Sequence, residues 1–251
     1  MGNFDSIFAY SLAGGGSGTV TVPGGDGNNG LMKDLAANWS FDNAGNLGKD
    51  YSGNNNDLTV EGSPIAATGQ AGGAVQTSVG NYFSRTNSTP FDTPRTQGFS
   101  FSAWYKIPTG AASAEQTVVA QYTDTPVDRA YRLVVTPTEA ILYWVYNTIG
   151  GQVKAATHTT TIDTWYHIAV THDPVAKKLQ FYINAVKKEF TYPANALDAT
   201  SEFSIGAHDN GNAGGDMLII DDASYWAARV LTELDIVTLY NGGTPLTISD
   251  Y

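Results

Sequence analysis

The segment at residues 164–188 constrains the fold most, because it reads as two antiparallel strands joined by a short turn. Side chains alternate along its first half, with Tyr166, Ile168, Val170 and His172 on one side and Trp165, His167, Ala169 and Thr171 on the other. This period of two predicts that one set faces a core. Asp173 and Pro174 predict the turn, since Pro pre-sets φ and Asp can accept a backbone hydrogen bond. A two-stranded ribbon is unstable alone, so the rest of the chain must supply a larger sheet.

Further short runs of strand-forming residues recur along the chain, with turn residues between them. Strands are expected at residues 75–84, 98–107, 116–122, 130–136, 140–147 and 153–160. Charged residues make up only 15% of the composition, while 27 Gly and 14 Tyr are present, which is typical of a turn-rich β protein. A chain of 251 residues can bury the core of one such domain. We predict an all-β fold in which two antiparallel sheets form a sandwich.

One short helix is expected near the C-terminus, at residues 233–240. Thr232 suits its N-cap, and Asp235 stands where a side chain can reach back to that cap. The Asn-Gly-Gly sequence at 241–243 predicts its end. The apolar residues expected to pack on the sandwich are Leu234, Val237 and Tyr240.

Residues 1–30 differ in composition from residues 31–251, which we expect to form the sandwich domain. Glycine-rich stretches flank a short apolar patch in this N-terminal arm. Such a segment loses much conformational entropy on ordering, so something must hold it in place. A partner subunit is one candidate, and folding back on its own domain is the other. We expect the extended arm to act as an anchor.

Charge and composition exclude several classes of function. The net charge of −11 leaves no basic stripe for a nucleic-acid backbone. Without cysteine, the chain has neither a disulfide framework nor a thiolate metal site. The first residues lack the basic region of a secretory signal, and no apolar run approaches the length of a membrane helix. We expect a protein that is made in a cytoplasm and does not insert into membranes.

The hairpin sequence Trp-Tyr-His-Ile-Ala-Val-Thr-His-Asp, followed by Leu-Gln-Phe-Tyr-Ile-Asn, resembles the central hairpin of laminin-G-like domains in the concanavalin A-like lectin/glucanase superfamily. Other segments resemble this family in the expected order, at residues 39–42, 50–57, 99–105, 203–206, 219–222, 231–236 and 239–242. The resemblance covers about residues 31–243. It implies a jelly-roll sandwich with a lectin-like role.

The resemblance also implies one structural calcium ion, which similar domains often hold between the opening strand and the closing hairpin. The matching positions are Asp42, Asp221 and Asp222. Carboxylate and amide oxygens suit calcium. Asn43 stands where the family often has a second acidic residue. The alternative is that residues 42–57 are only an Asx-rich turn loop.

A catalytic role is not expected. Glu233 and Asp235 resemble the first part of the E-x-D-x-x-E strand of laminarinase-type hydrolases, but Thr238 replaces the last Glu. Retaining hydrolysis needs two carboxyl groups about 5 Å apart, and this segment reads as a capped helix. His167 is most simply a packed core histidine.

Sugar binding would need an aromatic face with amide and carboxylate partners. The candidate carbohydrate-binding residues are Tyr143, Trp144 and Tyr146 on one expected strand, and Asp209, Asn210 and Asn212 in the polar loop at 207–216. The alternative is that the aromatic residues fill the sandwich core.

These observations favour a non-enzymatic structural or adhesive component of a larger assembly. Laminin-G-like domains are mostly secreted or displayed on surfaces, and a phage virion decoration or tail protein would be displayed without a secretory signal. We therefore predict a homo-oligomeric or assembly-bound protein, made in the host cytoplasm, that meets other virion proteins through residues 1–30 and binds glycans on the virion surface. The alternatives are a free-standing carbohydrate-binding module, extracellular or on a cell surface, and a glycoside hydrolase.

Overall fold

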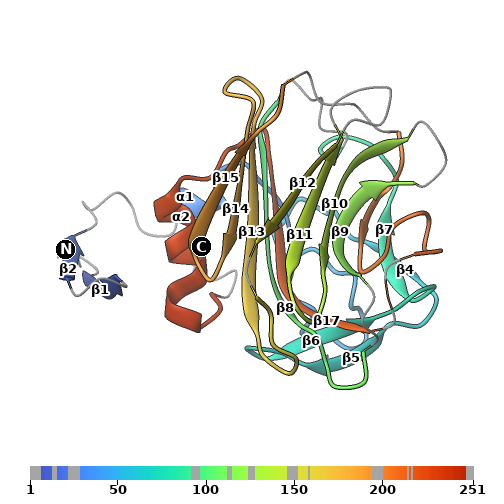
Figure 1. Ribbon diagram of the computed structural model, residues 1–251. Helices are drawn as coiled ribbons and strands as arrows, with labels where there is room; N and C mark the ends of the chain where they lie inside the picture. Colours follow the sequence, from blue (N-terminus) through green and yellow to red (C-terminus); the bar gives the residue numbers. More distant parts are fainter. Residues whose placement is uncertain are drawn as a thin grey trace.

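Two antiparallel β-sheets pack face to face in the computed structural model of the chain (Figure 1). The structure describes residues 7–12, 16–21, 29–91, 97–111, 115–123, 128–145, 152–157, 159–193, 200–213, 215 and 217–246. The predicted all-β sandwich with one short C-terminal helix is confirmed. No helix in these ranges is long and apolar enough to cross a membrane.

The eight-stranded sheet has the order β15-β14-β13-β8-β17-β6-β5, and β3 also pairs with β17. Its strands are β3 (Leu35–Trp39), β5 (Ile65–Thr68), β6 (Gly73–Thr77), β8 (Phe99–Lys106), β13 (Tyr166–Asp173), β14 (Lys178–Ile183), β15 (Val186–Thr191) and β17 (Leu218–Ala227). The predicted hairpin is β13 and β14, and its register pairs Val170 with Phe181. In the turn between them, Asp173 Oδ1 accepts hydrogen bonds from the backbone N–H groups of Val175 and Ala176, both at 2.9 Å.

The seven-stranded sheet has the order β12-β11-β10-β9-β16-β7-β4. Its strands are β4 (Thr59–Glu61), β7 (Tyr82–Arg85), β9 (Gln116–Tyr122), β10 (Arg129–Val135), β11 (Ala140–Val145), β12 (Gln152–Thr157) and β16 (Phe203–Ile205). The short β16 lies between β9 and β7, so segments far apart in the sequence become neighbours at the centre of this sheet.

The main core lies between the sheets and is rich in aromatic side chains. Trp39, Phe91, Phe203 and Tyr225 form a cluster of contacting rings within it, with the ring centroids of Phe91 and Phe203 4.9 Å apart. A second cluster, which includes Trp226, lies on the outer face of the eight-stranded sheet. Helices α1 (Asn29–Met32) and α2 (Glu233–Tyr240) cover that face beside β14 (Figure 1).

Both faces of β13 are therefore buried. Ile168 and Val170 point into the core between the sheets, whereas Ala169 belongs to the outer cluster under α2. The alternation correctly predicts two faces, and it does not reveal that the helix shields the second one.

Helix α2 begins and ends as predicted, and Tyr240 stacks on Trp104 of the sheet as expected, but Leu234 does not pack there. Asp235 N donates to Thr232 Oγ1 and Thr232 N donates to Asp235 Oδ2, which completes the capping box. Ile236 and Leu239 are buried, while Leu234 is 45% exposed, so the prediction that Leu234 packs on the sandwich is wrong. The outer cluster decides which stripe of the helix faces inward.

The single strand expected at residues 75–84 is two strands, β6 and β7, which belong to different sheets. Ser78 and Asn81 pair across the turn between them, and Gly80 adopts a φ of 73° there. Strands β5 and β15 and helix α1 were not expected. Every residue of β15 is exposed or half-buried, so this edge strand carries little hydrophobic pattern.

The N-terminal arm contains an antiparallel ribbon, β1 (Ile7–Leu12) and β2 (Gly16–Thr21). It pairs with neither sheet in the described part of the chain. The expected boundary between arm and domain, at residue 30, falls within α1.

Candidate functional site

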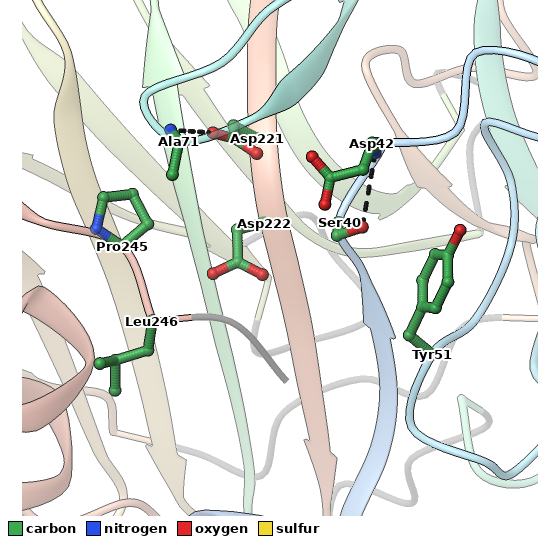
Figure 2. Close-up of a pocket in the computed structure, with 8 residues that line it drawn as sticks. All are labelled: Ser40, Asp42, Tyr51, Ala71, Asp221, Asp222, Pro245 and Leu246. Atoms are coloured by element: carbon green, nitrogen blue, oxygen red, sulfur yellow. Dashed lines mark hydrogen bonds between the residues drawn. The ribbon is translucent and has the colours of Figure 1, made fainter. Parts of the chain in front are cut away.

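Three carboxyl groups line a pocket of about 160 Å³ beside β17, which we call the carboxylate pocket. Its lining residues are Ser40, Asp42, Tyr51, Ala71, Asp221, Asp222, Pro245 and Leu246. Figure 2 shows Asp42, Asp221 and Asp222 around one space, with Leu246 on one side and Tyr51 on the other. The structure thus brings together all three residues that the sequence proposed as metal ligands.

An irregularity in β17 lets two consecutive residues line the same pocket. In a regular strand, Asp221 and Asp222 would point to opposite faces. The register of β17 against β8 shifts between Asp221 and Ser224, and Asp222 has a φ of 47°. Such a bulge redirects a side chain. Asn38 Nδ2 also donates a hydrogen bond to Asp222 Oδ1 at 3.0 Å.

The loop between β5 and β6, together with the first residue of β6, binds Asp221 and Asp42 through backbone N–H groups. Gln70 N and Ala71 N donate to Asp221 Oδ2 at 2.8 and 3.2 Å, and Gly73 N donates to Asp42 Oδ1 at 2.6 Å. A Cβ at Gly72 would lie 2.2 Å from Asp42 Oδ1, and Gly72 has a φ of 62°. Glycine is therefore required for this close approach.

The electrostatics of the pocket favour a proton or a cation on Asp221. Burial raises the pKa of Asp221 to about 8, the charge of Asp222 adds to this shift, and the two backbone N–H groups oppose it. The described residues that line the pocket include neither Lys nor Arg. Without a bound cation, Asp221 is therefore largely protonated at neutral pH.

Oxygen ligands of this kind suit calcium, but the three side chains do not form a complete metal site. Within the described ranges, no group of three or more His, Cys, Asp or Glu side chains is arranged to hold a metal ion. A calcium ion here would need two of the carboxylates together with backbone or water oxygens. The calcium site stays a prediction.

A second, more polar pocket of about 390 Å³ opens at the end of β9, and we call it the rim pocket. Its lining residues are Thr86, Asn87, Thr123, Asp128, Thr200, Ser201, Glu202 and Asn210. They come from segments that follow β7 and β9, precede β10 and β16, or follow β16. Among the described residues, the lining offers hydroxyl, amide and carboxyl groups and no aromatic ring.

Hydrogen bonds fix several groups of the rim pocket in place. Asp128 accepts from Thr200 N at 2.5 Å and from Thr200 Oγ1 at 2.9 Å. Gln121 Nε2 donates to Asn87 Oδ1 at 3.0 Å and to the carbonyl of Ser201 at 3.3 Å. Ser201 Oγ is buried and has no hydrogen-bond partner in the part of the chain that the structure describes.

Glu202 connects the rim pocket to the loop that carries Asn210. Tyr82 donates its phenolic hydrogen to Glu202 Oε1 at 3.2 Å. The Tyr82 ring also packs beneath Gly211, where a Cβ would lie 2.4 Å from the ring. Burial raises the pKa of the Glu202 carboxyl, and the nearby Glu61 charge raises it further.

Only one of the three predicted loop residues lines the rim pocket. Asn210 is exposed and lies in its wall. Asp209 N donates to the Tyr122 carbonyl at 2.9 Å, and Asn212 Nδ2 donates to the Asp209 carbonyl at 2.9 Å, so these two residues shape the loop.

His208 fixes the base of the same loop. Its backbone N–H donates to the Ala213 carbonyl at 2.7 Å. Arg132 lies 3.1 Å from Nε2 and can only donate, so Nε2 accepts and Nδ1 donates to Thr117 Oγ1 at 2.7 Å. This hydrogen-bond pattern corresponds to a neutral His208 imidazole that carries its proton on Nδ1.

The comparison with protein families agrees with the sandwich fold. The profile described as "Concanavalin A-like lectin/glucanases superfamily" matches residues 76–237, more than half of the chain. The chain belongs to this superfamily. A search of curated proteins found no significant match for this concanavalin A-like protein.

Several solved structures share the fold. They include the binding domain of Paraclostridial Mosquitocidal Protein 1, with a TM-score of 0.69, 17% identity, and coverage of 84% of this chain and 53% of that chain. The binding domain of botulinum neurotoxin serotype G has a TM-score of 0.65, 15% identity and coverage of 82% and 50%. The concanavalin A-like chain thus spans about half of each toxin binding domain.

Domain 4 of AbnA, an extracellular arabinanase from Geobacillus stearothermophilus solved in complex with arabinotriose, is similar over nearly its whole length. The TM-score is 0.62, the identity is 20%, and the match covers 82% of this chain and 98% of that domain. Because the sequence identities to these structures are 20% or lower, the similarity establishes a shared fold only.

The remaining predicted residues of this superfamily member lie on β11, on α2 or outside the described residues. Tyr143 and Trp144 lie in β11, which β10 separates from β9, and Tyr146 lies outside the described residues. Asp235 forms the cap of α2, and Glu233 pairs with Lys187, which supports the interpretation of the E-x-D segment as a helix start. The sequence did not single out Ser201 or Glu202, since neither lies in a motif.

Proposed function

We propose that this protein is a non-catalytic glycan-binding domain and that the rim pocket holds the sugar. The proposal rests mainly on the lining of that pocket, in which hydroxyl, amide and carboxyl groups surround one space. Sugars present many hydroxyl groups, each of which can donate and accept a hydrogen bond. A binding site must replace the water that these groups lose.

The comparisons support the same proposal at the level of the fold. The similar solved structures are mostly binding domains, and one of them is an arabinanase domain in complex with arabinotriose. The rim pocket lies where loops of the concanavalin A-like sandwich meet. Loops on a rigid scaffold are common sites of recognition.

A glycan array and calorimetry with the full chain test the proposal. We expect at least one glycan to bind, and Asn210→Ala to weaken that binding about tenfold, which is the loss of roughly one hydrogen bond. Asn43→Ala is the matched control, because Asn43 is exposed, accepts a hydrogen bond from Gly45 N and is not among the described residues that line the rim pocket. Binding that resists Asn210→Ala would place the sugar elsewhere.

Two carboxyl groups in the rim pocket make glycoside hydrolysis a second candidate. Hydrolysis uses an acid with a raised pKa and a second carboxylate, and Glu202 has the raised pKa. Asp128, however, is tied to the neighbouring loop by its two hydrogen bonds from Thr200. If the wild type releases reducing sugar from a bound glycan, and both Glu202→Gln and Asp128→Asn abolish that release, the protein is an enzyme. Binding without release would favour the glycan-binding domain.

We also propose that residues 1–30 attach the domain to a larger assembly, a phage virion on whose surface the sandwich is displayed. The support is the ribbon of β1 and β2, which pairs with neither sheet in the described residues. A two-stranded ribbon gains stability only by packing on something else. A second copy of the chain or another virion protein would supply that surface.

A further inference from the structure

The C-terminal segment 243–246 forms one wall of the carboxylate pocket, and we call it the cover segment. Its residues Pro245 and Leu246 line the pocket on the side opposite Asp42 and Tyr51 (Figure 2). Pro245 is buried, and Leu246 is half-buried against the outer cluster of the eight-stranded sheet. The cover segment therefore closes that side of the pocket.

The short turn η1 (Asn241–Gly243), which joins α2 to the cover segment, has the backbone of a hinge. Asn241, Gly242 and Gly243 have φ values of 44°, 64° and 100°, all in the left-handed region. Among the described residues, a Cβ added at Gly242 would meet no atom within 4 Å, and one at Gly243 would meet only Tyr240 Oη, at 3.9 Å. Packing therefore does not confine these glycines, and glycine changes backbone conformation at little steric cost. Hinges commonly lie at such ends of elements.

The Gln70 side chain fastens the cover segment to the rest of the sandwich. Its Nε2 donates a hydrogen bond to the Gly243 carbonyl at 2.8 Å. The backbone N–H of the same residue donates to Asp221 Oδ2, also at 2.8 Å. Gln70 thus connects the start of the cover segment to a buried carboxyl group of the pocket that the segment closes.

We propose that residues 243–246 are a hinged cover that controls the access of solutes to the carboxylate pocket, with Gln70 as its latch. When the bond from Gln70 to Gly243 breaks, rotation at η1 moves Pro245 and Leu246 away and opens the pocket to solvent. A segment held by one side-chain hydrogen bond and a half-buried leucine opens by a local fluctuation, without unfolding of the sandwich. This cover lies outside the rim pocket and does not depend on the proposed binding of glycans.

Thiol labelling measures the opening of the cover, because the chain contains no cysteine. Ser40→Cys places one thiol in the pocket lining, where its rate of reaction with iodoacetamide reports access. Gln70→Ala in that background should speed labelling about tenfold, the loss of roughly one hydrogen bond from the closed state. Gln76→Ala is the matched control, since Gln76 is also half-buried and, in the described part of the chain, no hydrogen bond joins its side chain to the cover segment. Equal labelling rates in the two variants would overturn the latch.

A second reporter separates opening of the cover from unfolding of the domain. Ser204→Cys places its thiol in β16, at a position that is 3% exposed, so only a larger unfolding event exposes it. Gln70→Ala should leave the labelling rate of this reporter unchanged, and equal acceleration at both reporters would overturn the proposal. Leu246→Ala weakens the packing of the cover on the outer cluster and leaves the latch in place, so it should also speed labelling in the Ser40→Cys background. An unchanged rate in Leu246→Ala would show that the segment does not control access.

Discussion

Asp221 shows how burial at a single residue couples stability to pH. Its pKa rises from 3.8 to about 8 on folding, so the folded chain binds the proton more tightly than the unfolded chain. Its contribution to stability is therefore lost as pH rises through that window. We expect the free energy of unfolding to fall between pH 6.5 and 8 in EDTA, with a slope of up to about 1.4 kcal/mol per pH unit.

Urea denaturation of the wild type and Asp221→Asn measures this effect. The variant should lose the slope, because an amide does not titrate. Millimolar calcium should flatten the wild-type slope if the carboxylate pocket binds the ion, since a cation holds Asp221 ionised. A wild-type curve that is flat in EDTA would contradict the assignment to Asp221.

His167 couples stability to pH in the opposite direction. Its ring is buried, its Nε2 lies 2.8 Å from Ser102 Oγ, and burial lowers its pKa to about 3. The unfolded chain takes up the proton near pH 6.5, so stability falls as pH drops from about 6.5 towards 3. NMR titration should show His167 neutral at pH 5, and an imidazole that titrates near pH 6.5 would contradict this expectation.

At the scale of an element, the loop between β5 and β6 depends on glycine at one position. Gly72→Ala forces a left-handed φ on alanine and drives Cβ against Asp42 Oδ1. We expect a loss of about 1–3 kcal/mol in the free energy of unfolding. Gly53→Ala is the matched control, because Gly53 has a φ of 88° and a Cβ added there would have no atom within 4 Å. Chemical denaturation gives the free energy of unfolding of both variants, and the difference between their losses measures the clash with Asp42. Equal losses would show that backbone strain alone causes the destabilisation.

The cap of α2 matters because this helix covers the outer cluster around Trp226. Thr232→Ala removes the hydroxyl that accepts from Asp235 N, and it should cost about 0.5–2 kcal/mol. Thr238→Ala is the control on the same helix, since its hydroxyl only bonds back to the Leu234 carbonyl. Thermal melts of the two variants test the difference, and a Thr232→Ala variant as stable as the control would exclude a role for the cap.

At the scale of the whole molecule, the arm should decide the state of association. Light scattering of the full chain and of a chain without residues 1–30 compares the masses in solution. We expect only the full chain to oligomerise or to enter particles, because the ribbon of β1 and β2 needs a surface to pack on. Equal masses, together with unchanged particle incorporation, would contradict the anchoring role.

Much of the fold was open to prediction because its signals are local. The alternation in β13, the Asx turn at Asp173 and the capping box at Thr232 each depend on a few neighbouring residues, and the structure confirms all three. Family resemblance also placed Asp42 and Asp221 together, since motif order reflects a shared topology.

The sequence by itself thus determined the sandwich, the turns and the capped helix, because periodicity and capping are properties of adjacent residues. Only the tertiary structure decided the contents of the rim pocket, whose walls include Asn87, Asp128, Ser201 and Asn210. These residues are far apart in the chain and meet because β16 inserts between β7 and β9. Strand order and loop paths depend on packing across the whole core, and no local pattern encodes them.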